Sequence, residues 1–536
     1  MNTIGGWSLI SSSLHYHQTL LLRHLHLIDI KPNEFDKLLC NHFIRQLHTL
    51  LVDVTPSNPL NSLKVEGFYL VKVCSQMPLL RICRLSFDYD NNNVNEIEIY
   101  SLKSHMILSS LLNTNQLRNL SVGIHSSYFL EHLLLCIPLI GKLSFSIKDQ
   151  DINENDLHDK IILPTTIDAH HLEYLSSLHI NCLNNISFHR IVSLLSSIFN
   201  QLSHLSLKFE ANTLVCGSMI ISGDIIQKLI IDRLQRMAIY NLNLLLYVRN
   251  DLEEKIIFNS FRRMEFIPRE KPKVVIRECY DPNHGTDDHC FIVFTLPYNG
   301  TTLLSHMFSN DFENDATNLF PHANILSLYG YKKTNSIRDL VKSESSLSSF
   351  IPWPLIPKIE INNSDVITQY ILKSLLEKAY NVDTLKIFDH RGIITRTILY
   401  NKENYGTRIN HQIKSLKINS ETWTLHNVER FCTLLSNQFC NLRIFSFTIY
   451  DSYHVWEWKP SRMKDGKKKS TKRIVNLIYL LVDHLQQLVY LEIFFCDMFQ
   501  HDTPYFPHLV RQELHQYPLS RLCRLQCFST NIQIWL

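Results

Sequence analysis

A six-position pattern of apolar and variable residues recurs along this chain. A leucine-like residue is followed by two variable residues, a second leucine-like residue, one variable residue and an apolar residue. Clear copies occupy 117–122, 202–207, 413–418 and 488–493. The last three positions alternate with the period of a β-strand that buries one face. The pattern therefore predicts many short strands, each with an apolar side and an open side.

The second leucine-like residue of each copy serves as a marker of its strand. Many markers are 23 to 35 residues apart, as from Leu120 to Leu143 and from Leu143 to Leu178, which leaves room for one strand and one returning helix or loop. The long steps from Met264 to Leu326 and on to Leu385 could each contain a degenerate copy. The full series is Leu25, Leu50, Leu85, Leu120, Leu143, Leu178, Leu205, Met237, Met264, Leu326, Leu385, Leu416, Phe445, Leu491 and Leu525.

Helical periodicity fills several of the intervals between these strands. Residues 189–199 and 427–435 place their apolar side chains on one helix face. Residues 32–40 predict another helix, because Pro32 stands near its start, acidic residues follow and leucines come last. Strand and helix in repetition predict an α/β fold, an irregular leucine-rich-repeat solenoid (horseshoe) with parallel strands on the concave face and helices or loops on the convex face.

Breaks in the repeat divide the chain into parts. We expect an N-terminal flank at 1–20, repeats over 21–266, an irregular insertion or degenerate repeat at 267–322, and further repeats over 323–536. Within the insertion, 291–294 predicts a short buried strand. Residues 461–473 carry seven basic residues against Asp465, and we interpret them as a solvated Lys-rich loop. A nuclear-import signal and an electrostatic docking patch are the alternatives for that segment.

The open positions of the predicted strands are rich in small polar residues. Serine recurs there, and the remaining positions carry charged or larger polar side chains: Ser86, Ser121, Ser144, Ser206, Ser327, Ser446, Glu492 and Gln526. One interpretation is an ordinary solvated sheet face, and the other is a set of contact hot spots for a partner. Our candidate partner-binding residues are His179, Lys208, Tyr240, Glu265, Tyr329, Lys386, Phe388, Lys417 and Asn419.

Composition narrows the classes of function. A formal net charge of +3 over 536 residues is too small for nucleic acid or an anionic membrane to be the main partner. The chain has 13 glycines, which is few for a fold that cradles phosphates on glycine-rich loops. Its 13 scattered cysteines suit a reducing compartment, cytoplasmic or nuclear, and we recognise neither a signal peptide nor a membrane-spanning stretch.

Sequence motifs of catalysis and metal binding are missing. We find no GxSxG, Walker, HExxH or GxGxxG motif. Residues 281–290 crowd aspartate, histidine and cysteine together, but in no recognised zinc spacing, and His24 and His26 share one strand face. A metal enzyme or hydrolase within 267–322 is therefore a minor hypothesis. We predict a protein that is not an enzyme and that has no catalytic residue, cofactor or metal.

The irregular repeats and two further segments resemble F-box/leucine-rich-repeat proteins of an expanded invertebrate family. The segments are Phe294-Thr-Leu-Pro-Tyr298 and Cys523-Arg-Leu-Gln-Cys527 with the closing residues 532–536. The resemblance covers the chain from about residue 20 onward. It implies that the repeats present a protein substrate and that an F-box docks on the Skp-type adaptor of a cullin–RING ubiquitin ligase. Residues 1–20 lack the Leu-Pro opening of an F-box, so we expect that module to be absent and carry over no adaptor contact.

The sequence thus favours a non-catalytic protein-binding scaffold, similar to the substrate-recognition part of an F-box receptor. Its partners would be a protein on the concave face and, only with an F-box restored, the Skp-type adaptor. The alternative is a free-standing leucine-rich-repeat adaptor without a ubiquitin role, nuclear through its Lys-rich segment. We expect no membrane partner and do not favour nucleic acid.

Overall fold

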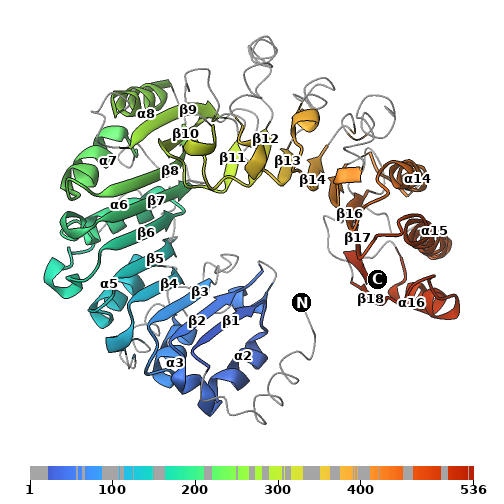
Figure 1. Ribbon diagram of the computed structural model, residues 1–536, viewed down its shortest axis with the longest axis horizontal. Helices are drawn as coiled ribbons and strands as arrows, with labels where there is room; N and C mark the ends of the chain where they lie inside the picture. The colour runs from blue at the N-terminus through green and yellow to red at the C-terminus, as the bar shows by residue number, and fades with distance from the viewer. Residues whose placement is uncertain are drawn as a thin grey trace. The chain divides into compact units, whose positions relative to one another are not determined.

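A computed structural model describes most of the chain, which folds as two compact units (Figure 1). Unit 1 comprises the described residues within 1–277 and 289–296, and unit 2 those within 278–288 and 297–536. The described residues are 22–55, 58–62, 67–86, 108, 111, 114–124, 126–147, 149, 163–210, 220–248, 251–264, 272–279, 289–304, 307, 316–329, 351–362, 375–389, 392, 395, 411–420, 422–425, 427–450, 463–495, 505–528 and 530–536.

Unit 1 contains a ten-stranded sheet in which β1 to β8 follow chain order and pair in parallel. The register places marker opposite marker, as for Leu120 with Leu143 and Leu143 with Leu178. The strands are β1 (His24–Ile28), β2 (Thr49–Asp53), β3 (Ile82–Ser86), β4 (Asn119–Ile124), β5 (Lys142–Ile147), β6 (Ser177–Cys182), β7 (His204–Glu210), β8 (Ile239–Val248), β9 (Lys273–Cys279) and β10 (His289–Leu296).

Helices return the chain between these strands and lie along one face of the sheet (Figure 1). They are α2 (Pro32–Leu39), α3 (Phe68–Gln76), α5 (Ser127–Cys136), α6 (Asn185–Leu194), α7 (Gly223–Leu229) and α8 (Asp251–Met264), with short 3-10 turns at His42–Gln46, Pro59–Ser62, Thr114–Gln116, Ala169–Leu172, Phe199–Gln201 and Ile231–Arg233. The predicted helix at 32–40 is confirmed as α2.

Several of these helices begin at a polar residue that caps them. The side chains of Ser126, Asn184 and Ser222 accept a hydrogen bond from the backbone N–H three residues on, at 3.2, 2.8 and 3.4 Å. Each bond satisfies a donor that the helix itself leaves unpaired. The helix predicted at 189–199 overlaps α6, which starts earlier because Asn184 caps it and ends at Leu194.

The core of unit 1 lies between the sheet and these helices. Leu143, Leu178 and Leu205 are at most 2% exposed, and the apolar residues two places further along each strand are buried with them. Burying one such side chain contributes about 1.5 to 3 kcal/mol before entropy is counted. Because a single strand and helix cannot enclose these leucines, stacking of neighbours is what makes the core.

The far edge of the unit 1 sheet departs from the repeat. Strand β8 pairs with β10 in antiparallel fashion, and β9 follows β10 at the edge. The predicted strand at 291–294 is confirmed within β10, where all four side chains are buried. Two markers are wrong: Met237 precedes β8 and is 86% exposed, and Met264 ends helix α8.

Unit 2 contains a nine-stranded sheet in which β11 to β17 follow chain order and pair in parallel. Its last neighbours, β19 and β18, are antiparallel. The strands are β11 (Thr302–Leu304), β12 (Ile325–Tyr329), β13 (Lys358–Asn362), β14 (Thr384–Phe388), β15 (Ser415–Asn419), β16 (Ile444–Ile449), β17 (Tyr490–Phe495), β18 (Arg524–Cys527) and β19 (Asn531–Trp535).

Strands β11 and β13 are the degenerate copies expected in the two longest marker steps. They place Leu303 and Ile359 in register with Leu326. The segment 267–322 therefore contributes to both sheets, with β9 and β10 in the first and β11 in the second. The predicted α/β class is confirmed at the level of two large, mostly parallel sheets with helices.

The helices of unit 2 include α9 (Ala316–Leu319), α14 (Val428–Gln438), α15 (Met463–His484) and α16 (Pro507–Gln516), with a 3-10 turn at Trp353–Leu355. Helix α14 overlaps the helix predicted at 427–435. Helices α14, α15 and α16 pack side by side on one face of the sheet (Figure 1).

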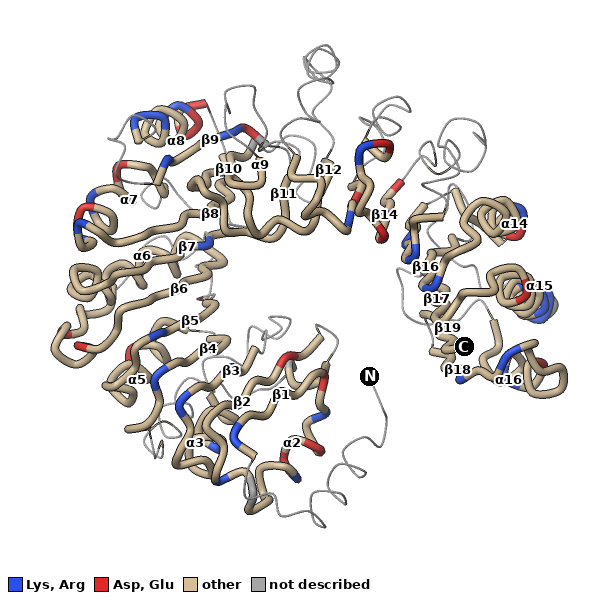
Figure 2. Tube along the Cα trace, in the orientation of Figure 1, with Lys and Arg blue, Asp and Glu red and all other residues tan. Residues whose placement is uncertain are grey.

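The prediction of a Lys-rich loop at 461–473 is wrong for residues 463–473, which form the first half of α15. Figure 2 shows lysine and arginine positions along α15, and the side chains of Lys468, Lys469 and Lys472 are exposed. Thr471 is 3% exposed and its hydroxyl accepts a hydrogen bond from the Phe506 N–H at 3.0 Å. The high density of positive charge led to the prediction of a loop. Long lysine side chains can, however, stay solvated on a helix, and here the backbone is continuous with the amphipathic helix that follows.

Aspartates that follow two of the strands form hydrogen bonds to other segments of the chain. The buried Asp149 follows β5, and its Oδ1 accepts hydrogen bonds from the Ser127 N–H and hydroxyl at 2.8 and 2.9 Å and from Arg190 at 3.2 Å. Asp389 follows β14 in the same way, is 1% exposed, and accepts from the Thr395 N–H at 2.8 Å. These carboxylates satisfy backbone donors on the helix side of each sheet.

Candidate functional site

Alternation along the strands gives the unit 2 sheet two different faces. On β14, Leu385 and Ile387 are buried against the helix side, so Lys386 and Phe388 lie on the opposite side. We call this opposite side of β12 to β17 the unit 2 open face; no described helix covers it (Figure 1). Register aligns its central row, which consists of Ser327, Glu360, Lys386, Lys417, Ser446 and Glu492.

Glu360 is shared by two lysines on this face. Its Oε1 lies 2.7 Å from Lys358 Nζ and 2.9 Å from Lys386 Nζ. Burial acts to raise the pKa of Glu360, but the hydrogen bonds and charges of the two ammonium groups outweigh it, so this pKa is lowered. Burial likewise acts to lower the pKa of Lys386, and Glu360 outweighs it and raises that pKa. Two ammonium groups on one carboxylate leave one positive charge in excess.

Lys417 stands directly beside Lys386 in the register of β14 and β15. Among the described residues it makes no ion pair, and its Nζ lies 5.2 Å from the centroid of the Phe494 ring. An ammonium over an aromatic face is attracted by the ring quadrupole, but this contact does not neutralise the charge. Like charges directly opposite each other on neighbouring strands repel. The centre of the open face is therefore electropositive.

Ser446 is the next residue of the row, opposite Lys417. Its side chain is on the open face because Phe445 and Phe447 on either side point into the core. The residue is 6% exposed, and its hydroxyl makes no hydrogen bond to a described residue. A buried hydroxyl without a hydrogen-bond partner is energetically unfavourable. The Ser446 O–H group therefore has an unmet hydrogen bond among the described residues.

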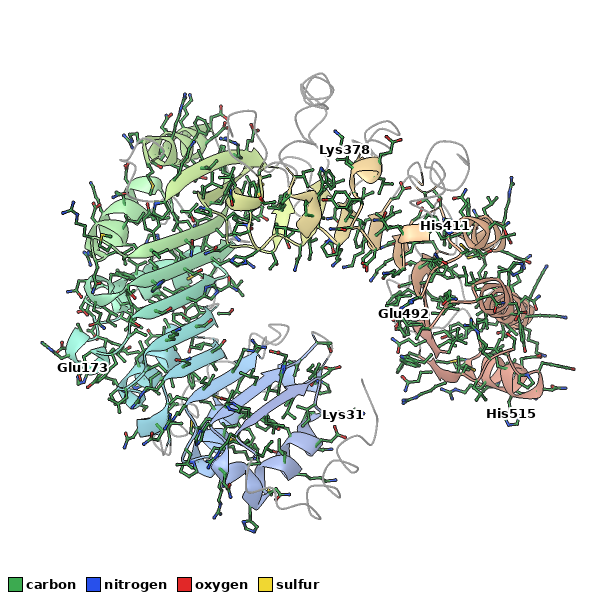
Figure 3. The ribbon with its side chains drawn as sticks, in the orientation of Figure 1. Lys31, Glu173, Lys378, His411, Glu492 and His515 are labelled. Atoms are coloured by element: carbon green, nitrogen blue, oxygen red, sulfur yellow. The ribbon has the colours of Figure 1, made fainter. Side chains whose placement is uncertain are left out.

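Glu492 ends the row and is held by amides rather than by a cation. Its Oε1 accepts hydrogen bonds from Asn531 Nδ2 at 3.0 Å and Gln533 Nε2 at 2.8 Å, both on β19. Figure 3 shows Glu492 pointing away from the helices of this unit. Burial, followed by the charge and hydrogen bond of Glu492, raises the pKa of neighbouring Tyr490. No ion pair joins Glu492 to Lys417 among the described contacts.

Four of the predicted partner-binding residues come together on this face. Lys386 faces Lys417 and Phe388 faces Asn419, so the four form a two-by-two patch on β14 and β15. Phe388 is half-buried, and Asn419 Oδ1 accepts a hydrogen bond from the Tyr450 hydroxyl at 2.6 Å. Tyr329 lies in β12, but its side chain is outside the described residues.

Sequence reasoning missed Lys358 and Glu360, although the alternating stretch 358–362 contains the signal. That stretch lies in a long marker step, and the six-position pattern at 356–361 carries isoleucine in place of leucine at its apolar positions. The alternation of buried Ile359 and Ile361 with charged neighbours would have identified a strand with an open charged side.

The corresponding face of unit 1 has a different chemistry. On β4 to β7, which we call the unit 1 open face, two rows of aligned open positions are mostly small or neutral: Ser121, Gly123, Ser144, Ser146, His179, Asn181 and Ser206, with Lys208 beside Asn181. The row before them holds Asn119, Lys142, Ser177 and His204. Asn181 Nδ2 donates to Ser146 Oγ at 3.0 Å. The predicted residues His179 and Lys208 both have exposed side chains, on neighbouring strands. Partial loss of hydration against the sheet, followed by the charge of Lys208, still lowers the pKa of His179.

Two other predicted partner-binding residues have different outcomes. The prediction that Tyr240 contacts a partner is wrong, because this residue is 2% exposed and stands in register with the core residue Leu205. The error follows from the false marker Met237, which shifted the expected strand by three residues. Glu265 lies outside the described residues.

The described residues contain no group of three or more histidine, cysteine, aspartate or glutamate side chains arranged to hold a metal ion. Of the crowded segment 281–290, residues 281–288 lie outside the described part. His26, which the sequence pairs with His24, instead has its Nε2 2.8 Å from Asp53 Oδ2, and the same carboxylate pairs with Arg84.

Comparisons with known proteins give no further assignment: no protein-family model matches the chain, and a search of curated proteins finds no significant match. Within the described residues, no helix has both the length and the apolar character needed to cross a bilayer. Function therefore has to be argued from the two open faces themselves.

Proposed function

We propose that this chain is a non-catalytic, protein-binding leucine-rich-repeat solenoid, similar to the substrate-recognition part of an F-box ubiquitin-ligase receptor. The observation that carries the proposal is the unit 2 open face, where charged, amide and aromatic side chains are aligned in rows across β12 to β17. The partner protein lies along these rows, in the concave face that such a solenoid forms.

The arrangement of the two sheets supports a repeat architecture. Consecutive strands are neighbours and parallel over most of each sheet, and the described helices lie on one side of their sheet. Each added strand lengthens the rows of the open face by one residue and leaves that face uncovered. This geometry suits recognition of an extended surface better than enclosure of a small molecule, which favours concave apolar pockets.

The composition of the unit 2 open face supports protein binding over simple solvation. Phe388 and Phe494 are half-buried rings that flank the lysines, and Tyr490 and Trp535 add a second aromatic pair with centroids 5.5 Å apart. Aromatic anchors surrounded by polar groups are the usual composition of interface hot spots. Solvation alone would not require large apolar rings at these positions.

A photo-crosslinking experiment tests the proposal. A benzophenone amino acid replaces Phe388 in one variant and Tyr380, an exposed residue in the turn before β14, in a matched control. We expect Phe388 to crosslink a defined protein in cells of the source and Tyr380 not to. Equal labelling from both positions, or none from Phe388, would contradict binding on the open face.

The same crosslinked material separates the two forms of the proposal. Co-purification of a Skp-type adaptor and a cullin supports a receptor that delivers its partner to a ubiquitin ligase. A defined partner without these subunits supports a free-standing adaptor, for which the exposed Lys468, Lys469 and Lys472 on α15 offer a basic surface. If the protein accumulates in the nucleus and loses this accumulation when the three lysines are changed to glutamine, the result would support a nuclear adaptor.

A further inference from the structure

We propose that the exposed thiol of Cys440, paired with His411, is a site of reversible covalent modification that forms a mixed disulfide with a small soluble disulfide such as oxidised glutathione. Cys440 lies in the turn after α14, and its Sγ lies 3.2 Å from His411 Nδ1. A thiol and an imidazole at this distance are the usual arrangement of an activated cysteine nucleophile. The inference does not depend on the proposed function, because the pair lies outside the strands of the unit 2 open face.

The repeat itself brings these two side chains together. His411 and Cys440 each stand two residues before the first apolar residue of a six-position pattern, which is Ile413 in one repeat and Leu442 in the next. The strands that follow, β15 and β16, are neighbours in parallel register. Equivalent positions of adjacent repeats therefore lie side by side, close to the strand spacing of about 4.8 Å. The pair is thus a product of the strand register.

Amide side chains hold the two turns in place. Asn441 Nδ2 donates a hydrogen bond to the His411 backbone carbonyl at 2.9 Å, which links the turn of Cys440 to the segment before β15. Gln412 Nε2 in turn donates to two carbonyls of the preceding repeat at 2.8 and 2.7 Å. The thiol also lies 3.8 Å from Asn441 Oδ1, so the imidazole is its nearer acceptor. A base that a third group holds in position completes the arrangement of an activated thiol.

Cys440 differs from the other described cysteines in combining exposure with a base. Cys40 and Cys523 are also exposed, but among the described contacts neither thiol has a histidine within hydrogen-bond distance. The remaining described thiols are buried or partly buried. Burial raises the pKa of such thiols, as it does for Cys432, and keeps them protonated and unreactive. We therefore expect modification to be selective for Cys440.

The reaction is a thiol–disulfide exchange, which needs no further oxidant. In the tautomer with its proton on Nε2, His411 accepts the thiol proton at Nδ1 as the Cys440 sulfur attacks one sulfur of oxidised glutathione. A sulfur–sulfur bond forms between Cys440 and that half of the reagent, and the original sulfur–sulfur bond breaks. The departing glutathione thiolate takes up the proton from the imidazolium and leaves as reduced glutathione. An excess of reduced glutathione reverses the exchange.

Incubation of the full-length protein with oxidised glutathione tests this inference, with the occupancy of each cysteine followed over time by mass spectrometry. We expect Cys440 to be modified about 10-fold faster than Cys40 and Cys523 at neutral pH, and reduced glutathione to remove the modification. Equal rates at the three cysteines would overturn the proposal, because exposure alone would then explain the labelling. This comparison uses the unaltered chain, so it holds even if a variant does not fold.

Variants then test the role of the imidazole. His411→Gln keeps a polar side chain but removes the base, and it should lower the rate at Cys440 to that at Cys40. Asn441→Ala removes the link between the two turns and should lower the rate at Cys440 by about 3-fold. The matched control is His515→Gln, which changes an exposed histidine on α16 and should leave that rate unchanged. An unchanged rate in His411→Gln, with an unchanged thermal transition, would refute the assigned base.

Discussion

The two open faces are built on the same type of strand but differ in chemistry. In unit 1 the rows from Ser121 to Ser206 and from Gly123 to Lys208 hold serine, glycine, asparagine, one histidine and one lysine. In unit 2 the row from Glu360 to Glu492 holds two glutamates, two lysines and one serine, and Phe388 and Phe494 lie beside it. The buried positions are alike, since both sheets bury leucine, isoleucine and phenylalanine against helices. The difference teaches that the buried side determines the fold, while the open side is free to differ in its chemistry.

The largest expected effect tests whether stability resides on the helix side. Asp149→Ala removes the acceptor of the Ser127 N–H and hydroxyl and leaves Arg190 without its carboxylate. Arg190 has a side chain that is only 17% exposed, so the uncompensated charge and lost bonds should cost about 3 kcal/mol. Urea unfolding followed by circular dichroism measures this loss.

The matched control for that change lies on the open face of β5, the strand that Asp149 follows. Ser144→Ala alters a half-exposed position of β5 and should change the free energy of unfolding by less than about 0.5 kcal/mol. Equal losses for Asp149→Ala and Ser144→Ala would mean that the open face carries stability as well, and the distinction between the two sides would fail.

A substitution in unit 2 is expected to increase the free energy of unfolding, by less than the Asp149→Ala change decreases it. Gly466→Ala falls in the basic half of α15, where an added Cβ meets no atom within 4 Å. Alanine is the better helix former by up to about 1 kcal/mol, and a position near the helix start should gain about half of that. A solvated loop would gain nothing, so thermal unfolding of this variant checks the helix directly.

Gly223→Ala provides the contrast in unit 1. Its Cβ would lie 2.7 Å from the backbone carbon of Ser260, so the same substitution should destabilise the contact of α7 with α8. If both glycine variants shift the thermal transition in the same direction, the close packing of these helices has been misjudged.

The strands were predictable because their signal is local. Alternation around Leu143, Leu178 and Leu416 places each in a strand with the correct side buried. Strand direction is not encoded in that alternation, so the antiparallel pairs of β8 with β10 and of β17 with β19 could not be foreseen. The exact residue at which a strand begins was also hard to predict. The false marker at Met237 placed the strand three residues too early, so the core residue Tyr240 was predicted to be a partner contact.

The candidate site was only partly predictable, because its chemistry depends on pairing between strands. The sequence identifies Lys386 and Lys417 as open positions. It does not show that Glu360 neutralises the first, that Lys417 lies over Phe494, or that the Ser446 hydroxyl is buried without a partner. These properties arise from register among segments that are tens of residues apart, which no local pattern contains.

The smallest expected effect concerns His179 on the unit 1 open face. The pKa of His179 is lowered from its ordinary 6.5, first by burial and then by Lys208, so the folded state disfavours the protonated ring. The unfolded chain takes up the proton first, and stability should be constant above about pH 6.5 and fall as pH decreases toward the lowered pKa. NMR titration of the ring should give a midpoint below 6.5, and Lys208→Gln should move it only part of the way back, because burial remains. A midpoint that Lys208→Gln restores completely would show that charge, and not burial, governs this face, which would bring the unit 1 open face closer in kind to that of unit 2.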